Sequence, residues 1–333
     1  MKAMILAAGY GTRLRPLTEN MPKAIIPVAN TPLIKYNLLL LKKYGIEEVI
    51  INIHYLSDLI KGLLGDGSNL EMKISYSYEP EILGTAGGIK KVEDFLKGES
   101  FLVINSDILV DIDLQEVIDF HYQKKAMVTM VLRKNNSPDQ YGAIEVDSAG
   151  IVRQFLGKLN WEGEPLRKMM FTGIHILQPA VLNYITPNMF VSISDQTYPQ
   201  IISAGKLIYG YLMNKGYWQD VGTPKRYLDA HREILQGRFT VYNNIHEVEP
   251  GIWIGKNIFL DPTVNLIKPL MIGDNSKIES GAVLGPYVVI GDNCHIRSNT
   301  KIHNTVLWEN EIINEGTLLS HSILGNGLFV RGD

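Results

Sequence analysis

The pattern of apolar and polar positions changes twice along this chain, near residue 141 and near residue 250. Up to about residue 235, continuous apolar runs alternate with amphipathic stretches. Examples of the two kinds are the runs "KAMILAA" (2–8), "EVIINI" (48–53) and "FLVINSD" (101–107) and the stretches "PLIKYNLLLLKKYG" (32–45) and "DLQEVIDFHYQKK" (113–125). This alternation predicts a parallel sheet covered by helices on both faces. From residue 141 onward fewer helical stretches separate the runs, so we expect the sheet to become mixed.

A last helix is predicted over residues 223–237. Thr223 can accept hydrogen bonds at its start, Pro224 suits the first turn, and Gly237 suits the end. We expect this helix to close the first domain.

After residue 250 the apolar period becomes six. The positions in this phase are Ile254, Leu260, Leu266, Ile272, Ile278, Leu284, Ile290, Ile296 and Ile302. A second phase follows at Val306, Ile312, Leu318, Leu324 and Val330. Each such position is expected to place one inward aliphatic side chain on a short strand, and stacked coils then share a core. The pattern resembles the hexapeptide repeat of left-handed parallel β-helices.

Length and composition agree with two domains. The chain has 333 residues, of which 45% are apolar and 20% charged, enough for two cores. We therefore predict a catalytic domain over 1–237, a linker over 238–250 and a β-helix over 251–333. The fold class is α/β, a Rossmann-like, mostly parallel sheet followed by the β-helix.

Charge and cysteine content exclude several classes of protein. The net charge is −3 without a long basic run, so we expect no nucleic-acid partner. The apolar start of the chain is too short for a membrane span and lacks a cleavage region, which favours the cytoplasm and no membrane partner. The single cysteine, Cys294, cannot form an internal disulfide.

The segment "LAAGYGTRLRPLTENMPKAIIPV" (6–28) carries the candidate chemistry. A dinucleotide fingerprint would need a glycine where Leu14 stands, and a mononucleotide P-loop would need a Lys-Ser or Lys-Thr pair. A simple tight turn would explain the glycines but not the cations Arg13, Arg15 and Lys23. A cradle for a triphosphate explains both, because glycine lets backbone N–H groups approach phosphate and cations supply charge.

The residues "GYGTRLRPLTENMPKAIIPV" (9–28) resemble the G-x-G-T-R-L…P-K signature of sugar-1-phosphate nucleotidylyltransferases. The resemblance continues, in the same order as in that family, at "LGTAGG" (83–88), "NSD" (105–107), "YGAIEVD" (141–147), "FTGIHI" (171–176) and "WQDVGTP" (218–224). It implies that a sugar-1-phosphate oxygen attacks the α-phosphorus of a nucleoside triphosphate and releases pyrophosphate. The phosphate nucleophile is already ionised, so cations and a metal rather than a general base are expected.

The resemblance also implies roles for individual residues. Arg13 and Lys23 are the expected catalytic cations, and Asp107 is the expected catalytic carboxylate. Asp107 and Asp220 are the expected ligands of Mg²⁺, which takes one or two carboxylates together with substrate phosphates.

The remaining site residues follow from the same motifs. Those expected to bind the nucleotide are Leu6, Ala8, Gly9, Gly11, Thr12, Gly84, Thr85 and Gly88. Those expected to bind the sugar phosphate are Gly142, Lys158, Thr172 and Gly173. The family usually shows Glu-Lys-Pro where this chain has "FLGKLNWEGEP" (155–165), so Arg167 or Lys168 is an alternative to Lys158.

The substrates and the role of the tail stay open at this level. The overall pattern is most similar to GTP-using mannose-1-phosphate guanylyltransferases. Enzymes that use UTP, dTTP, CTP or ATP with glucose- or heptose-1-phosphate share the motifs, as do non-catalytic regulatory or scaffold relatives. The tail histidines His295, His303 and His321 raise acyl transfer as an alternative, but no long acyl-carrier loop interrupts the repeats. Formation of a homo-oligomer, or packing against the catalytic domain, is the preferred role for the tail.

Overall fold

The computed structural model describes residues 1–134, 141–241 and 245–332. These residues divide into two compact units. The first unit comprises Met1–Gly9, Asn37–Ser106 and Val110–Trp218, and the second comprises Tyr10–Tyr36, Asp107–Leu109 and Gln219–Asp333. Three elements have residues in both units: α1 (Leu33–Lys43), β7 (Ile108–Asp111) and β13 (Tyr217–Asp220).

A mixed sheet of nine strands forms the first unit. Its strands are β1 (Ala3–Leu6), β4 (Glu48–Ile53), β5 (Lys73–Tyr78), β6 (Phe101–Asn105), β8 (Val128–Lys134), β9 (Ile144–Val146), β10 (Val152–Phe155), β11 (Arg167–Leu177) and β12 (Ile208–Leu212). The order is β10-β9-β11-β6-β1-β4-β5, and β8 pairs with both β11 and β12. The strands around β1 are parallel, whereas β11 runs antiparallel to its neighbours. The predicted change to a mixed sheet is therefore confirmed.

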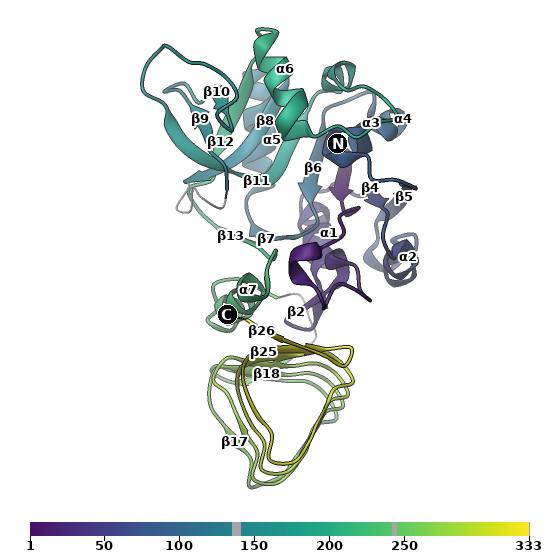
Figure 1. The fold of residues 1–333 in the computed structure, drawn as a ribbon, viewed down its shortest axis with the longest axis vertical. Coiled ribbons are helices and arrows are strands. Elements are labelled where there is room, and N and C mark those ends of the chain that lie inside the picture. Colours follow the sequence, from purple (N-terminus) through teal and green to yellow (C-terminus); the bar gives the residue numbers. More distant parts are fainter. Residues whose placement is uncertain (135–140, 242–244, 333) are drawn as a thin grey trace. The chain divides into compact units, whose positions relative to one another are not determined.

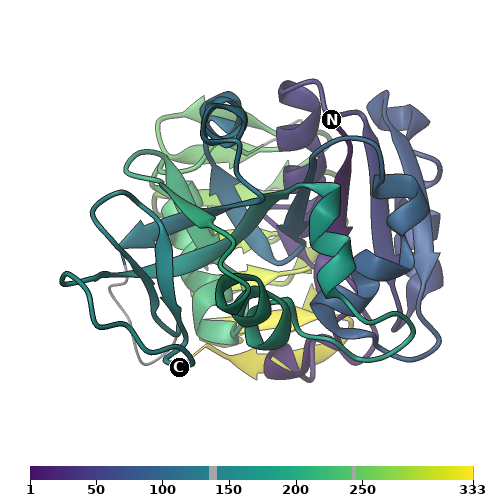
Figure 2. The same ribbon diagram turned by 90° about the horizontal axis from the view of Figure 1, so that it is seen from above.

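Helices lie on both faces of this sheet (Figures 1 and 2), as the alternating pattern predicted. The α-helices are α2 (Ser57–Leu64), α3 (Gly84–Lys91), α4 (Glu93–Leu96), α5 (Leu114–Lys124) and α6 (Tyr198–Ser203). Single turns of 3₁₀-helix or π-helix add η3 (Ser68–Leu70), η4 (Pro179–Tyr184) and η5 (Ile193–Thr197). Helix α5 begins at a side-chain cap, since Asp113 accepts hydrogen bonds from the N–H groups of Gln115 and Glu116. The buried core includes Met4, Val103 and Phe101.

The second unit contains the elements of the glycine-rich loop, one helix and a stack of short strands. The loop elements are η1 (Thr12–Leu14), η2 (Lys23–Ile25), β2 (Pro27–Val28) and β3 (Thr31–Pro32), and the helix is α7 (Pro224–Leu235). As predicted, Thr223 caps α7 by accepting from the N–H of Arg226, and Gly237 follows its end with a φ of 73°.

The stacked strands form the predicted β-helix, whose three faces appear as the sides of a triangle in Figure 1. Its strands are β14 (His246–Glu249), β15 (Ile252–Ile254), β16 (Phe259–Leu260), β17 (Asn265–Leu266), β18 (Leu270–Ile272), β19 (Lys277–Ile278), β20 (Val283–Leu284), β21 (Val288–Ile290), β22 (His295–Ile296), β23 (Lys301–Leu307), β24 (Ile312–Ile313), β25 (Leu318–Gly325) and β26 (Leu328–Arg331). Strand β14 lies inside the predicted linker and pairs antiparallel with β15. Residues 242–244 of that linker lie outside the described residues.

The first phase of the six-residue repeat is confirmed, and the second is off by one residue at Ile312 and Leu318 but correct at Leu324, which packs against the β-helix core. Ile296 and Ile302 are buried, as predicted, but Ile312 is 59% exposed and Leu318 is 73% exposed. Ile313 is the buried neighbour instead. The coil from Ile296 to Ile313 has seventeen residues, one fewer than the eighteen from Ile278 to Ile296, whereas the predicted second phase would shorten it to sixteen.

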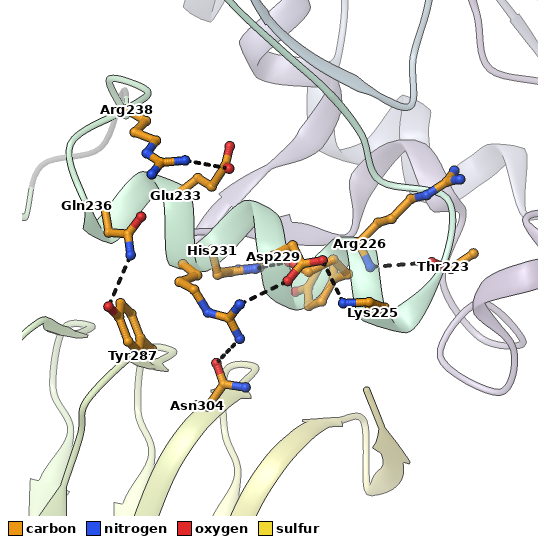
Figure 3. Close-up of polar contacts among 12 residues, drawn as sticks. Thr223, Lys225, Arg226, Asp229, His231, Glu233, Gln236, Arg238, Tyr287 and Asn304 are labelled. Atoms are coloured by element: carbon orange, nitrogen blue, oxygen red, sulfur yellow. Dashed lines mark hydrogen bonds and ion pairs between the residues drawn. The ribbon is translucent and has the colours of Figure 1, made fainter. Parts of the chain in front are cut away.

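Helix α7 packs against the β-helix through polar contacts within the second unit (Figure 3). Arg232 donates to the side-chain oxygen of Asn304 at 3.2 Å, and Gln236 donates to the hydroxyl of Tyr287 at 3.0 Å. The indole N–H of Trp308 donates to the hydroxyl of Tyr227 at 2.8 Å. These contacts fix the helix that follows the "WQDVGTP" motif to the last coils.

Candidate active site

The glycine-rich loop of the second unit is shaped around Gly11. This residue has a φ of 66°, and a Cβ on it would lie 3.0 Å from the Cβ of Lys23 and 3.2 Å from Cγ2 of Thr18. Thr18 also donates a hydrogen bond to the Gly11 carbonyl at 2.9 Å. Glycine is therefore required both by the backbone angle and by the close approach. The loop then turns through η1, where Leu14 is buried and Arg13 is exposed.

Lys23 and Asp107 form an ion pair. Lys23 is the first residue of η2, and Asp107 lies between the end of β6 and the start of β7. The pair therefore joins two segments that are far apart in sequence. Their side chains are 12% and 28% exposed. Burial alone would raise the pKa of Asp107, but the charge and hydrogen bond of Lys23, with the charge of Arg13 adding to them, hold that pKa below its usual range. Asp107 is therefore ionised at neutral pH.

Asp220 is held by a second cation, Arg226. Asp220 ends β13, and Arg226 lies in the first turn of α7, from which its guanidinium reaches back to both carboxylate oxygens at 2.7 and 2.6 Å. The two side chains are 12% and 15% exposed. A charged hydrogen-bond donor on both oxygens fixes the orientation of the carboxylate.

Gly222 lies where these groups meet. A Cβ on Gly222 would be 3.1 Å from Nη2 of Arg13 and 3.3 Å from Oδ2 of Asp220. The N–H of the preceding Val221 donates to the Asp107 carbonyl at 2.9 Å. The second unit thus gathers what we name the cation–carboxylate cluster. Its members are Arg13, Lys23, Asp107, Asp220 and Arg226. With three cations and two carboxylates, its formal charge is +1.

The cluster supplies few ligands to a metal by itself. Among residues 1–134, 141–241 and 245–332, no group of three or more His, Cys, Asp or Glu side chains could hold a metal ion. The two carboxylates of the cluster, Asp107 and Asp220, would bind a cation only together with oxygens from a substrate. That is the coordination that Mg²⁺ adopts with nucleotide phosphates.

The predicted nucleotide residues of the first unit lie in and beside a buried polar network. Asn52 accepts from the N–H of Ala7 at 2.8 Å and donates to Glu79 at 2.8 Å, and Glu79 accepts from the N–H of Leu83 at 2.9 Å. A Cβ on Gly88 would lie 2.7 Å from Glu79, so only glycine fits there. The network connects the segment after β1 to the start of α3.

The other residues predicted to bind the nucleotide have varied surroundings. A Cβ on Gly84 would lie 2.6 Å from the Val191 carbonyl, and Thr85 accepts from the N–H of Ile193. The Leu6 carbonyl accepts from the N–H of Ser106 at 3.1 Å. The remaining members are Ala8, which is buried, Gly9, around which a Cβ would meet nothing within 4 Å, and Thr12, which is exposed at the start of η1 in the second unit.

The predicted sugar-phosphate residues also belong to the first unit. Thr172 is buried, donates to the Val131 carbonyl at 2.9 Å, and accepts from the indole of Trp218 at its own carbonyl. Gly173 has a φ of 86°, and a Cβ on it would lie 2.7 Å from the side chain of Asn105. Gly173, which the sequence predicts to bind the sugar phosphate, is therefore closely approached by Asn105 in this structure.

Lys158 follows a turn with two positive φ angles, 51° at Leu156 and 69° at Gly157. Its ammonium group contacts Asp195 at 2.5 Å, with both side chains partly exposed. Gly142 packs under the same turn, since a Cβ on it would lie 2.2 Å from Leu156. The alternatives Arg167 and Lys168 lie on β11, exposed.

Sequence reasoning missed Arg226, Asn52, Glu79 and Asp195. Arg226 follows the helix cap by three residues, the position from which a long side chain can reach back to the preceding strand. Glu79 immediately follows β5, at the carboxyl edge of the sheet. Each position could have been singled out as a polar residue at an element end.

The comparisons with known proteins agree with this geometry. The family described as Nucleotidyl transferase matches residues 2–237, and the family described as GMPPB C-terminal domain matches residues 266–331. The chain therefore belongs to the nucleotidyl transferase family, as the resemblance implied, and is an enzyme of that class.

Individual relatives span most of the chain. A UTP–glucose-1-phosphate uridylyltransferase from Synechocystis sp. is 31% identical over 96% of this chain and 86% of its own length. Mannose-1-phosphate guanylyltransferase 1 from Arabidopsis thaliana is 31% identical over 98% of this chain and 86% of its own length. A crystal structure of a putative glucose-1-phosphate thymidylyltransferase from Bacillus anthracis superposes with a TM-score of 0.62 at 22% identity, covering 73% of this chain and 98% of that one. This last likeness concerns the fold.

Proposed function

We propose that this enzyme transfers GMP from GTP to mannose-1-phosphate, giving GDP-mannose and pyrophosphate. The observation that carries the reaction class is the cation–carboxylate cluster, which contains all four motif residues expected to act on phosphate. The choice of GTP and mannose-1-phosphate is supported by the guanylyltransferase relatives and by the C-terminal family match.

The chemistry requires charge compensation. A phosphate oxygen of the sugar phosphate attacks the α-phosphorus, a new P–O bond forms, and the bond to the β-phosphate oxygen breaks to release pyrophosphate. Arg13, exposed on η1, would bind the triphosphate and the departing pyrophosphate. Lys23 would neutralise charge near the α-phosphate, and Asp107 keeps its ammonium group in place. Preorganised cations lower the barrier because charge grows on the phosphoryl oxygens.

Asp107 and Asp220 fit a magnesium site in their donor chemistry. Both are carboxylates whose backbones are linked through Val221, and the two lie beside the same arginine, Arg13. Nucleotidyltransferases of this family generally use a divalent metal. When bound, Mg²⁺ would supply Lewis acidity and offset phosphate charge. Arg226 would orient Asp220 toward it.

The first unit supplies the proposed contacts to the base and the sugar phosphate. The backbone around Gly84 and Gly88 would receive the base, and Lys158, paired with Asp195, would bind the sugar phosphate. The ion pair keeps the Lys158 ammonium group positioned and ready to exchange Asp195 for phosphate.

The test is a pyrophosphate-release screen of GTP, UTP, dTTP, CTP and ATP against mannose-1-phosphate and glucose-1-phosphate, with Mg²⁺. We expect GTP with mannose-1-phosphate to be fastest. Asp107→Asn should abolish release, whereas the matched control Asp113→Asn, at the exposed cap of α5, should retain it. Undiminished release by Asp107→Asn would refute the metal assignment.

A second candidate reaction uses UTP and glucose-1-phosphate. The Synechocystis relative, at the same identity as the Arabidopsis one, favours it. The same screen separates the two, since faster release from UTP with glucose-1-phosphate would replace the first proposal.

We further propose a cytoplasmic homo-oligomer. None of the helices in the described ranges has the length and apolar content needed to cross a membrane. Phe259 and Ile312 are more than half exposed on the face formed by β16, β19, β22 and β24, which offers apolar area to a second copy. Light scattering of the purified enzyme measures the number of copies.

A further inference from the structure

A cavity of about 540 Å³ lies on the β-helix, outside the cation–carboxylate cluster. It is lined by residues of β20, β23, β25 and β26, all in the second unit. Its volume lies in the range of small-molecule sites. Neither the proposed reaction nor the repeat pattern assigns a role to it.

The lining of this cavity is rich in nitrogen bases and cations. Lys301 and His303 come from β23, His321 from β25 and Arg331 from β26. The rings of His303 and His321 meet edge to face, with centroids 5.1 Å apart. None of the lining residues in the described part of the chain is a carboxylate, and within that part neither Lys301 nor Arg331 forms an ion pair. An anion would satisfy these groups.

Apolar and aromatic surface lies next to the cations. Phe329 is 52% exposed and Leu318 is 73% exposed, and both line the cavity. An inorganic anion would leave this surface in water. A ligand that joins a planar ring to a phosphate would cover both parts, because the ring can stack on the Phe329 side chain.

The corner beside the cavity carries a different residue type from the preceding coils but the same left-handed backbone. His321 has a φ of 49°, at the corner where the preceding coils have Asn304 and Tyr287. Asn304 and Tyr287 have φ angles of 42° and 61°, and asparagine and histidine are among the residues that adopt this conformation most readily. The His321 carbonyl accepts from the N–H of Gly332 at 2.8 Å, which fastens the end of β26 beside the corner. The final hairpin thereby brings Phe329 and Arg331 next to the two histidines.

We propose that this cavity is a second ligand site, which binds a nucleoside phosphate. Lys301, Arg331 and the two histidines bind the phosphate, and Phe329 stacks on the base. The site is separate from the residues proposed for catalysis, so it can be tested whether or not the substrate assignment is correct.

The experiment is isothermal titration of the full chain with GMP in the absence of Mg²⁺. We expect a binding event that Lys301→Ala/Arg331→Ala weakens more than tenfold and that Arg13→Ala, in the cluster, leaves intact. The matched control Lys256→Ala removes an exposed lysine of the same β-helix that does not line the cavity. It should bind GMP as the wild type does. All substituted residues except Arg13 are on the β-helix surface, and unchanged thermal midpoints verify the fold.

Two further arms distinguish the ligand's parts. Inorganic phosphate should bind the same site at least tenfold more weakly than GMP. Phe329→Ala should remove this difference in affinity between GMP and phosphate. The proposal is overturned if every GMP-binding event survives the double substitution or if Arg13→Ala eliminates all of them. It is equally overturned if inorganic phosphate binds as tightly as GMP. Should the double variant melt early, Lys301→Gln alone is titrated under the same criteria.

Discussion

At the scale of single residues, the orientation of Asp220 depends on Arg226. The guanidinium holds both oxygens of a carboxylate that is only 12% exposed. Outer residues that orient a metal ligand typically contribute ten- to a hundredfold to activity or metal affinity. Arg226 has a counterpart on the same helix turn, Lys225, which is 67% exposed and pairs with Asp229.

We predict that Arg226→Ala lowers kcat/KM by about ten- to a hundredfold and raises the Mg²⁺ concentration for half-maximal rate. The reason is that Asp220 loses the donor that fixes it. Pyrophosphate release measured over a range of Mg²⁺ concentrations gives both values. Lys225→Ala should change neither, and an equal loss in both variants would show that the effect comes from α7 as a whole.

Gly222 offers a second residue-scale test. A Cβ at this position would meet the Arg13 guanidinium at 3.1 Å and the Asp220 carboxylate at 3.3 Å. In the proposed reaction, displacing either group by a fraction of an ångström would misplace charge at the reacting phosphate. We therefore expect Gly222→Ala to reduce kcat about ten- to a hundredfold, with little change in the thermal midpoint.

The control for this glycine lies in α2. A Cβ on Gly62 would meet nothing within 4 Å, so Gly62→Ala should leave kcat unchanged. It should also stabilise the helix by about 0.5–1 kcal/mol, because alanine loses less backbone entropy on folding. Full activity in Gly222→Ala would mean that the reaction does not depend on Arg13 in the position that it has in this structure.

These residues also show what could be predicted at this scale. The motifs identified Arg13, Lys23, Asp107 and Asp220, because each stands in a recognisable run of sequence, and the structure brings the four together. Arg226 was missed because a basic residue in a first helical turn is usually solvated. Only the direction in which β13 enters α7 shows that it reaches Asp220.

At the scale of elements, the buried side of each β-helix strand is set by coil length. Ile312 and Ile313 are adjacent on β24, yet Ile313 is 3% exposed and Ile312 is 59% exposed. The coil from Ile296 to Ile313 has seventeen residues instead of eighteen, and the predicted second phase, set at Val306 rather than Leu307, shortens it by one residue too many. Sequence pattern could predict the β-helix but not this missing residue, since Val306 and Leu307 are both apolar and buried.

We predict that Ile313→Ala destabilises the enzyme by about 2–4 kcal/mol, through lost burial and the cavity left behind. Ile312→Ala is the matched control, and its change in unfolding free energy should stay within about 0.5 kcal/mol. Urea denaturation followed by circular dichroism measures both. The reverse order of the two effects would contradict the corrected register.

At the scale of the whole molecule, the two compact units do not follow the order of the chain. Residues 10–36 and 107–109 cluster with the β-helix and α7, although hundreds of positions of chain separate some of these segments. A prediction from the sequence divides a chain at a point along it, as the boundary at 237 does. It cannot show that the glycine-rich loop of residues 10–36 shares a unit with the tail, because the contacts responsible are non-local.

The two units share one property that a solution measurement can test, which is buried neutral histidine. Burial lowers the pKa of His121 to about 4 and that of His175 to about 3, both in the first unit. In the second unit burial lowers the pKa of His231 to about 4, against an opposing hydrogen bond to the Tyr227 carbonyl. Nε2 of His231 accepts a hydrogen bond from the N–H of Ala29 at 3.0 Å. A proton on Nε2 would remove this bond and point at the hydrogen of the Ala29 N–H.

Stability should therefore fall on acidification before any carboxylate titrates. Unfolded histidine binds a proton near pH 6.5, while these three stay neutral until about pH 4 or below, so the unfolded state gains protons first. Their contribution is complete above pH 6.5 and is lost as the pH falls from 6.5 toward 4. Each histidine adds a slope of up to about 1.4 kcal/mol per pH unit. Urea unfolding at steps between pH 7.5 and 5 measures that slope. His231→Gln should lower this slope by the contribution of one histidine, whereas His246→Gln, at an exposed position, should not lower it. A flat profile in the wild type would mean that the three rings take up protons without unfolding.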